Sequence, residues 1–117
     1  MANFAWTFDM TYHLIRLRAQ YQDDFENATN REHYGIWNAI ATRISLNSRF
    51  LVTARQCQIK WAALKRGYEN ICRILSGNPS QFPIQSPNSF DIEFFDLMQD
   101  EFWLPTSNNS INLLFMI

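Results

Sequence analysis

The stretch Thr53-Ala54-Arg55-Gln56-Cys57-Gln58-Ile59-Lys60-Trp61-Ala62-Ala63-Leu64-Lys65-Arg66-Gly67-Tyr68 decides the fold. An apolar stripe at helical spacing runs through it and beyond it, through Cys57, Trp61, Leu64, Tyr68, Ile71 and Leu75. Other side chains fall away from that stripe: Arg55, Gln56, Lys60, Ala63 and Arg66. A capping box at Thr53-x-x-Gln56 and a stop at Gly77 and Pro79 predict one helix from Thr53 to about Leu75.

Two helices are expected upstream of this one. The first begins near Trp6, with Thr7 or Asp9 as its N-cap, and the acidic stretch 23–27 ends it or loops out of it. The second begins with the capping box Thr29-Asn30-Arg31-Glu32 and ends around 43–46. Residues 45–52 are then the connection to the third helix. The pattern predicts an all-α domain.

The rest of the chain has a different composition. Residues 1–77 form the expected three-helix core, and residues 78–89 are a linker in which three prolines prevent a continuous helix. A fourth helix, acidic and aromatic, is expected over 90–103, packed on or near the core. Residues 104–117 are a tail with an apolar end, a candidate for docking a protein partner or for self-association.

Charge is distributed unevenly along the chain. The net charge is −1, yet all ten Lys and Arg residues lie in residues 1–80, which carry six acids and a net charge of +4. Residues 81–117 carry five acids and no Lys or Arg. Seven basic residues and one acid, Glu69, lie between Arg43 and Arg73. This segment either attracts a polyanion or is an ordinary solvated helix surface.

Several functional classes have no pattern in their favour. No apolar run is long enough to span a membrane, and no secretory signal is visible at the N-terminus. Cys57 and Cys72 would lie about 22 Å apart on one helix, so they are expected to be reduced, as in an intracellular protein. His13 and His33 are isolated, which argues against a zinc site. No nucleophile has a base at a recognisable spacing, so we expect no enzyme, cofactor or small-molecule substrate.

Three tryptophans, Trp6, Trp37 and Trp61, are spaced as on three successive helices, which is similar to the Myb/SANT framework. The run Thr53-x-x-Gln56-Cys57-x-x-Lys60-Trp61-x-x-Leu64-x-x-x-Tyr68 resembles the trihelix (Myb/SANT-like) DNA-binding family. That family also carries an acidic, aromatic fourth helix, similar to Ser89-Phe90-Asp91-Ile92-Glu93-Phe94-Phe95-Asp96. The resemblance covers about residues 5–103. It implies a three-helix bundle of helix-turn-helix type with an additional C-terminal helix. Within that bundle, the residues expected in the core are Trp6, Trp37, Cys57, Trp61, Leu64 and Tyr68.

Sequence-specific binding of double-stranded DNA is the function that the resemblance implies, with the third helix in the major groove. The residues expected at that interface are Arg49, Arg55, Gln56, Ile59, Lys60, Ala63 and Arg66. Arg55 is suited to guanine, Ile59 and Ala63 to a thymine methyl group. Gln56 either pairs with adenine or caps its own helix. Where the family often has a basic residue before the third helix, this chain has Val52, so Arg49 or Arg55 would hold that phosphate.

A nuclear protein of transcription, chromatin or telomeres, or one derived from a transposon, is the expected context. The alternative is a SANT-type module that binds proteins in a nuclear complex through residues 90–117. The sequence leaves the DNA target, the partner and the oligomeric state open. It also leaves open whether residues 90–117 regulate DNA binding or bind a partner.

Overall fold

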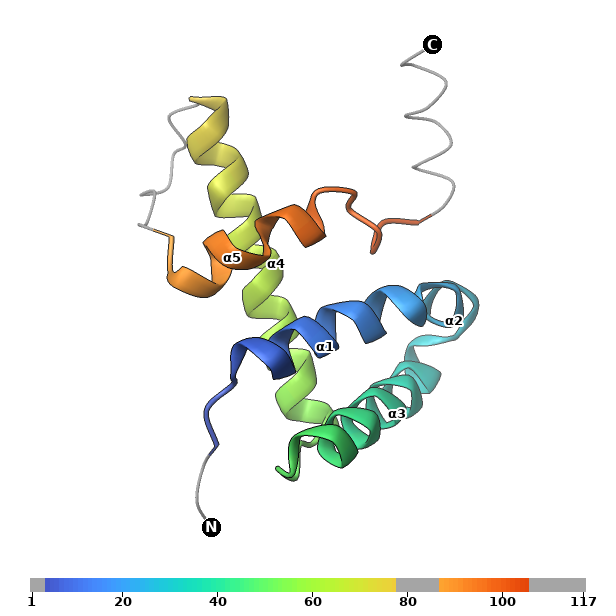
Figure 1. Ribbon diagram of the computed structural model, residues 1–117. Coiled ribbons are helices and arrows are strands. Elements are labelled where there is room, and N and C mark those ends of the chain that lie inside the picture. The colour runs from blue at the N-terminus through green and yellow to red at the C-terminus, as the bar shows by residue number, and fades with distance from the viewer. Residues whose placement is uncertain (1–3, 78–86, 106–117) are drawn as a thin grey trace.

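The computed structural model describes residues 4–77 and 87–105 and contains five helices in those ranges (Figure 1). They are α1 (Phe8–Gln20), α2 (Gln22–Asn27), α3 (Asn30–Ser48), α4 (Ala54–Ser76) and α5 (Ser89–Met98). Every regular element of the described residues is helical, so the prediction of an all-α bundle with an extra C-terminal helix is confirmed.

The starts of α1, α3 and α4 follow from local side-chain chemistry. Thr7 caps α1, and its hydroxyl oxygen accepts a hydrogen bond from the Met10 amide at 3.1 Å. The two capping boxes expected at Thr29 and Thr53 are both present. At the end of α4, Gly77 adopts a left-handed conformation with φ of 68°, which glycine reaches without a steric penalty. These residues satisfy backbone groups that a helix end leaves unpaired.

Three expected boundaries were wrong. The acidic stretch 23–27 is neither a helix end nor a loop but most of the short helix α2. Helix α3 continues to Ser48, so the connection to α4 is only residues 49–53. The Ser45 hydroxyl keeps this connection tight, because it accepts a hydrogen bond from the Val52 amide at 2.8 Å. The last helix ends at Met98 instead of 103, and Glu101 follows with φ of 50°.

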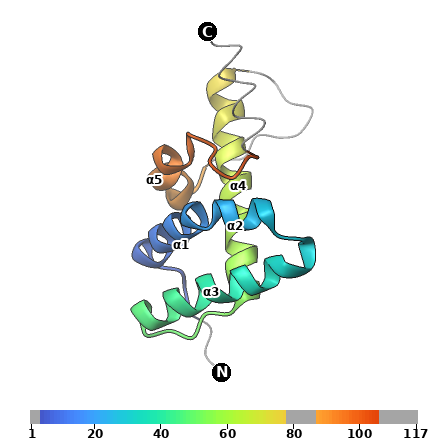
Figure 2. The ribbon, with the colours of Figure 1, turned by 90° about the vertical axis from the view of Figure 1, so that its right-hand side faces the viewer.

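Helices α1 and α3 lie side by side, and α4 crosses behind both of them (Figures 1 and 2). The centre of the domain is apolar, with Leu14, Ile15, Ile40, Ile44 and Cys57 almost completely buried. Burial raises the pKa of the Cys57 thiol to about 12, and both cysteines are free. Of the residues expected in the core, five are buried: Trp37, Cys57, Trp61, Leu64 and Tyr68. Trp6 differs, because it precedes α1 and is only half-buried, packed against the edge of the core.

Helix α5 packs across α4 and completes the core. Phe94 and Met98 are 4% and 2% exposed, so they are as buried as the centre of the three-helix bundle. After α5, the chain places Trp103 edge-on against Trp61, with the ring centroids 5.6 Å apart. The Tyr68 hydroxyl donates a hydrogen bond to the Glu101 carboxylate at 2.8 Å. The aromatic residues of 90–103 are therefore largely internal packing.

Arg18 connects this C-terminal segment to α1. Its side chain is only 8% exposed, and its guanidinium lies 4.0 Å from the Phe25 ring centroid. It donates a hydrogen bond of 2.6 Å to the amide oxygen of Gln22, whose own amide nitrogen reaches the backbone oxygens of Trp103 and Leu104. Burial lowers the pKa of Arg18 to about 10. The sequence did not single out Arg18, although position 18 lies four residues after Leu14 on the apolar side of α1.

Candidate nucleic-acid interface

The exposed face of α4 carries three of the expected DNA-binding residues. Arg55, Ile59 and Arg66 lie at i, i+4 and i+11, which is one face of a helix, and all three are exposed. Ile59 is 56% exposed although it is apolar. Ala63 borders this face and is half-buried. The structure therefore brings together a guanidinium near the start of α4, an isolated apolar side chain and a second guanidinium two turns later.

Gln56 caps its own helix. Its side-chain oxygen accepts a hydrogen bond from the Thr53 amide at 2.9 Å, and its backbone amide donates to the Thr53 hydroxyl at 3.1 Å. A bidentate contact with adenine needs both the oxygen and the nitrogen of the amide group. Of the two roles left open by the sequence, the structure shows the capping role.

Lys60 lies on another side of α4. Its ammonium group is 4.1 Å from the centroid of the Phe90 ring, in the first turn of α5. Burial lowers the pKa of Lys60, while the nearby Asp91 carboxylate opposes that shift. Because Lys60 follows Arg55 by five residues, it points about 140° away from Arg55 around the helix. The structure thus separates Lys60 from the face that carries Arg55, Ile59 and Arg66.

At Gly67, the Asp91 side chain of α5 lies close against the backbone of α4. A Cβ atom at this position would overlap the Asp91 carboxylate. That carboxylate also belongs to the capping box at the start of α5, so it is not free to move aside without loss of the box. Glycine in the middle of a helix is normally unfavourable by about 1 kcal/mol, and here the close approach of α5 explains it.

The other basic residues of this segment are spread over several surfaces. Arg49 is exposed and ends α3 with φ of 71°, next to the start of α4. Arg73 is exposed in the last turn of α4. Arg43 belongs to α3 and faces α1, where it lies close enough to His13 to lower the pKa of that imidazole. The basic stretch 43–73 is therefore not one continuous surface.

No group of three His, Cys, Asp or Glu side chains in the described part of the chain is placed to hold a metal ion. None of the helices in 4–77 and 87–105 combines the length and the apolar character needed to cross a membrane.

The comparison with protein families gives a match over most of the chain. The model of the Myb/SANT-like DNA-binding domain matches residues 3–100, which include all five helices. Searches of curated proteins and of solved structures gave no match. The helical bundle agrees with this family match, and the tryptophans Trp37 and Trp61 lie in its core. The chain belongs to the Myb/SANT-like DNA-binding domain family.

Proposed function

We propose that the protein binds double-stranded DNA sequence-specifically, with the exposed face of α4 in the major groove. The observation that carries this proposal is the exposed face formed by Arg55, Ile59 and Arg66. The opposite side of α4 packs in the core of the domain, so this face is free of internal packing. A major groove is wide enough to admit one α-helix, and its base edges are distinct for each base pair.

The residues of this face have different roles in the proposal. Arg55, in the first turn of α4, is suited to a bidentate contact with guanine, and Ile59 and Ala63 to the methyl group of thymine. Arg49 and Arg66 are suited to phosphates, which position the domain without reading sequence. Lys60 is not part of this surface, because its ammonium group is held over Phe90.

Such an activity fits a nuclear protein that acts in transcription, in chromatin or at telomeres, or one derived from a transposon.

The second candidate function is a protein-interaction module that uses residues 90–117. In the described part of that segment, Ile92 is 63% exposed and Glu93 and Asp96 are exposed, whereas Phe94 and Met98 are buried in the domain itself. The surface that remains on α5 is thus small and acidic, which favours the DNA proposal.

Selection of binding sites from random duplex DNA tests the proposal. We expect the full chain to enrich one short motif, and Arg55→Ala to weaken binding to it by about 1–3 kcal/mol and relax one position. Arg66→Ala should weaken binding to all sequences and reduce the dependence on salt. Lys60→Ala should change affinity much less than Arg55→Ala.

Arg31→Ala is the matched control, because Arg31 is also exposed and its loss changes the net charge equally. If Arg31→Ala weakened binding as much as Arg55→Ala, binding would depend on net charge alone. Absence of any enriched motif, together with loss of a bound protein when the exposed residues Ile92, Glu93 and Asp96 of α5 are replaced by alanine, would favour the interaction module instead.

A further inference from the structure

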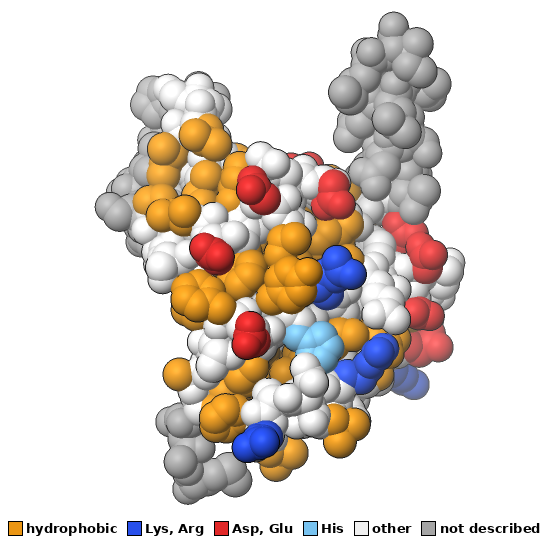
Figure 3. Space-filling view, viewed as in Figure 1, with side chains coloured by type: hydrophobic (Ala, Val, Ile, Leu, Met, Phe, Trp, Pro, Cys, Tyr) orange, Lys and Arg blue, Asp and Glu red, His pale blue; other side chains and the backbone are white. Residues whose placement is uncertain are grey.

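A groove of about 660 Å³ is lined by residues of α1 and α3. These two helices lie on the side of the bundle away from α4 (Figures 1 and 2). Basic side chains and a histidine gather on the face that α1 and α3 share (Figure 3). This groove shares no residue with the proposed DNA-binding face of α4. It is lined from both helices and from the connection that follows α3.

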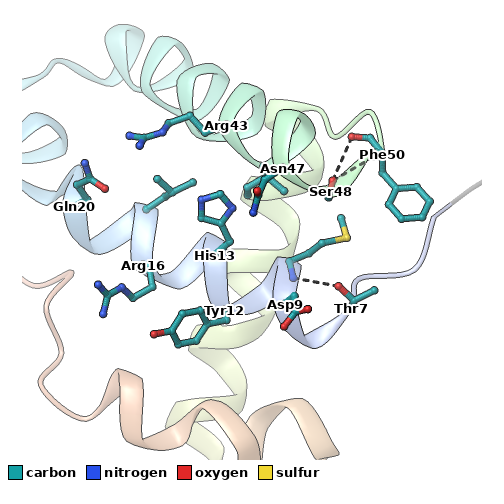
Figure 4. A pocket seen from close by; sticks show the side chains of 13 residues that line it. Thr7, Asp9, Tyr12, His13, Arg16, Gln20, Arg43, Asn47, Ser48 and Phe50 are labelled. Atoms are coloured by element: carbon teal, nitrogen blue, oxygen red, sulfur yellow. Dashed lines mark hydrogen bonds between the residues drawn. The ribbon is translucent and has the colours of Figure 1, made fainter.

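The two ends of the groove differ in chemistry. Arg16 and Gln20 from α1 and Arg43 from α3 project toward one end, and Phe50 lies at the other (Figure 4). Met10 and Ile44 form a buried apolar floor, and Phe50 is 45% exposed. The groove therefore has a cationic end and an apolar end, with His13 between them.

The cationic end has no carboxylate of the groove beside it, although Arg16 also lines a neighbouring hollow together with Asp100. Asp9 is the one acid among the described residues that line the groove, and it follows Thr7 at the start of α1. Seven residues separate Asp9 from Arg16, which is about 10 Å along a helix. The guanidinium carbon of Arg16 lies 5.9 Å from the centroid of the Tyr12 ring. Two guanidinium groups thus share one end of a concave surface without a carboxylate of the groove beside them.

His13 experiences that unbalanced charge. Its pKa is lowered by burial and, to a smaller extent, by Arg43. Asp9 and Arg16 are the other charged groups of the groove on its own helix. An anion at the cationic end would offset the effect of Arg43, so it would raise the pKa of His13. Its binding would then tighten as the pH falls through that raised value.

We propose that this groove binds an acidic peptide segment of a partner protein, with a carboxylate between Arg16 and Arg43 and an apolar side chain against Phe50. Arginine is well suited to carboxylates because its guanidinium group forms two parallel hydrogen bonds with them. The sugar-phosphate backbone of a DNA duplex offers no apolar side chain for the floor of this groove. The inference does not depend on the DNA-binding proposal, since the groove shares no residue with the proposed DNA-binding face of α4.

A synthetic nine-residue peptide with four aspartates and two leucines tests the proposal. Its binding to the full chain is measured in the absence of DNA. We expect measurable binding by fluorescence anisotropy and at least tenfold weaker binding by the double variant Arg16→Gln/Arg43→Gln. The control variant Arg31→Gln/Arg73→Gln loses the same charge at exposed positions outside the groove and should bind as the parent does. An NMR titration should show the His13 pKa raised in the complex.

Three results would overturn the proposal. One is equal binding of a peptide with asparagine in place of aspartate. Another is equal loss of binding in both double variants, which would reflect net charge only. The third is loss of duplex DNA binding by Arg16→Gln/Arg43→Gln but not by the control, because the groove would then contact phosphates.

Discussion

At the scale of single residues, glycines on two different helices should respond in opposite ways to substitution by alanine. Gly35 on α3 has no heavy atom near the position of a Cβ, whereas a Cβ at Gly67 would meet Asp91 of α5. Helix propensity favours alanine over glycine at both positions. Of these two positions, only Gly67 has packing that opposes the preference for alanine. The same substitution therefore separates the intrinsic preference of the backbone from the contact between α4 and α5.

We expect Gly35→Ala to raise the free energy of unfolding by about 1 kcal/mol. Gly67→Ala should instead lower it by about 1–3 kcal/mol, because the added methyl group overpacks the contact and displaces the Asp91 carboxylate. Urea denaturation of the two variants measures both effects. If Gly67→Ala stabilised the protein as much as Gly35→Ala, the close approach of α5 would not exist in solution.

At the scale of elements, the tight connection between α3 and α4 positions the proposed DNA-binding face. Arg49 turns the chain with φ of 71°, in the left-handed region that most side chains avoid. The Ser45 hydroxyl then accepts a hydrogen bond from the Val52 amide, and Thr53 caps the start of α4. A basic residue stands here at a position better suited to glycine, and the proposed phosphate contact would account for it.

Arg49→Gly should therefore stabilise the domain and weaken its binding to DNA. We expect a gain of about 0.5–1 kcal/mol, since relief of the left-handed conformation exceeds the added entropy of the unfolded chain. Arg31→Gly, in the first turn of α3, loses the same charge and should destabilise the domain. Thermal unfolding and DNA affinity at two salt concentrations distinguish the variants. Stabilisation without any change in DNA affinity would remove Arg49 from the proposed interface.

At the scale of the whole molecule, α5 is part of the folding unit. Trp61 and Tyr68 of α4 are covered by residues of the C-terminal segment, among them Phe95 and Trp103. Phe94 and Met98 enter the core directly. Arg18 and Gln22 add polar contacts to the backbone of residues 103 and 104. A three-helix core that ends at residue 77 would expose much of the apolar side of α4 to water.

Removal of the residues after 77 should accordingly abolish cooperative unfolding. Burial of a large apolar side chain is worth about 1.5–3 kcal/mol, and Phe94 and Met98 alone approach the total stability of a small domain. We expect the 1–77 fragment to keep helical circular dichroism but lose a sharp thermal transition. The 1–105 fragment is the control and should unfold cooperatively. A sharp transition in 1–77 would show that α5 is dispensable.

The candidate site shows how far periodicity predicts surface position. Arg55, Ile59 and Arg66 were expected at the interface and lie on one exposed face, because local helical geometry alone fixes their common direction. Lys60 was expected beside them and lies under α5. The identity of the side chain gave no sign of this, since lysine is usually exposed. Only the packing of a helix about thirty residues later in the chain decided it.

The sequence by itself determined the all-α class, the starts of α1, α3 and α4 and most of the core, because caps and apolar periodicity are local properties of the chain. Tertiary structure decided where α5 lies, why position 67 is glycine, and which basic residues share a surface. It also formed the groove between α1 and α3, which joins His13 and Arg16 to Arg43. These features depend on contacts between segments distant in sequence, and no local pattern encodes such contacts.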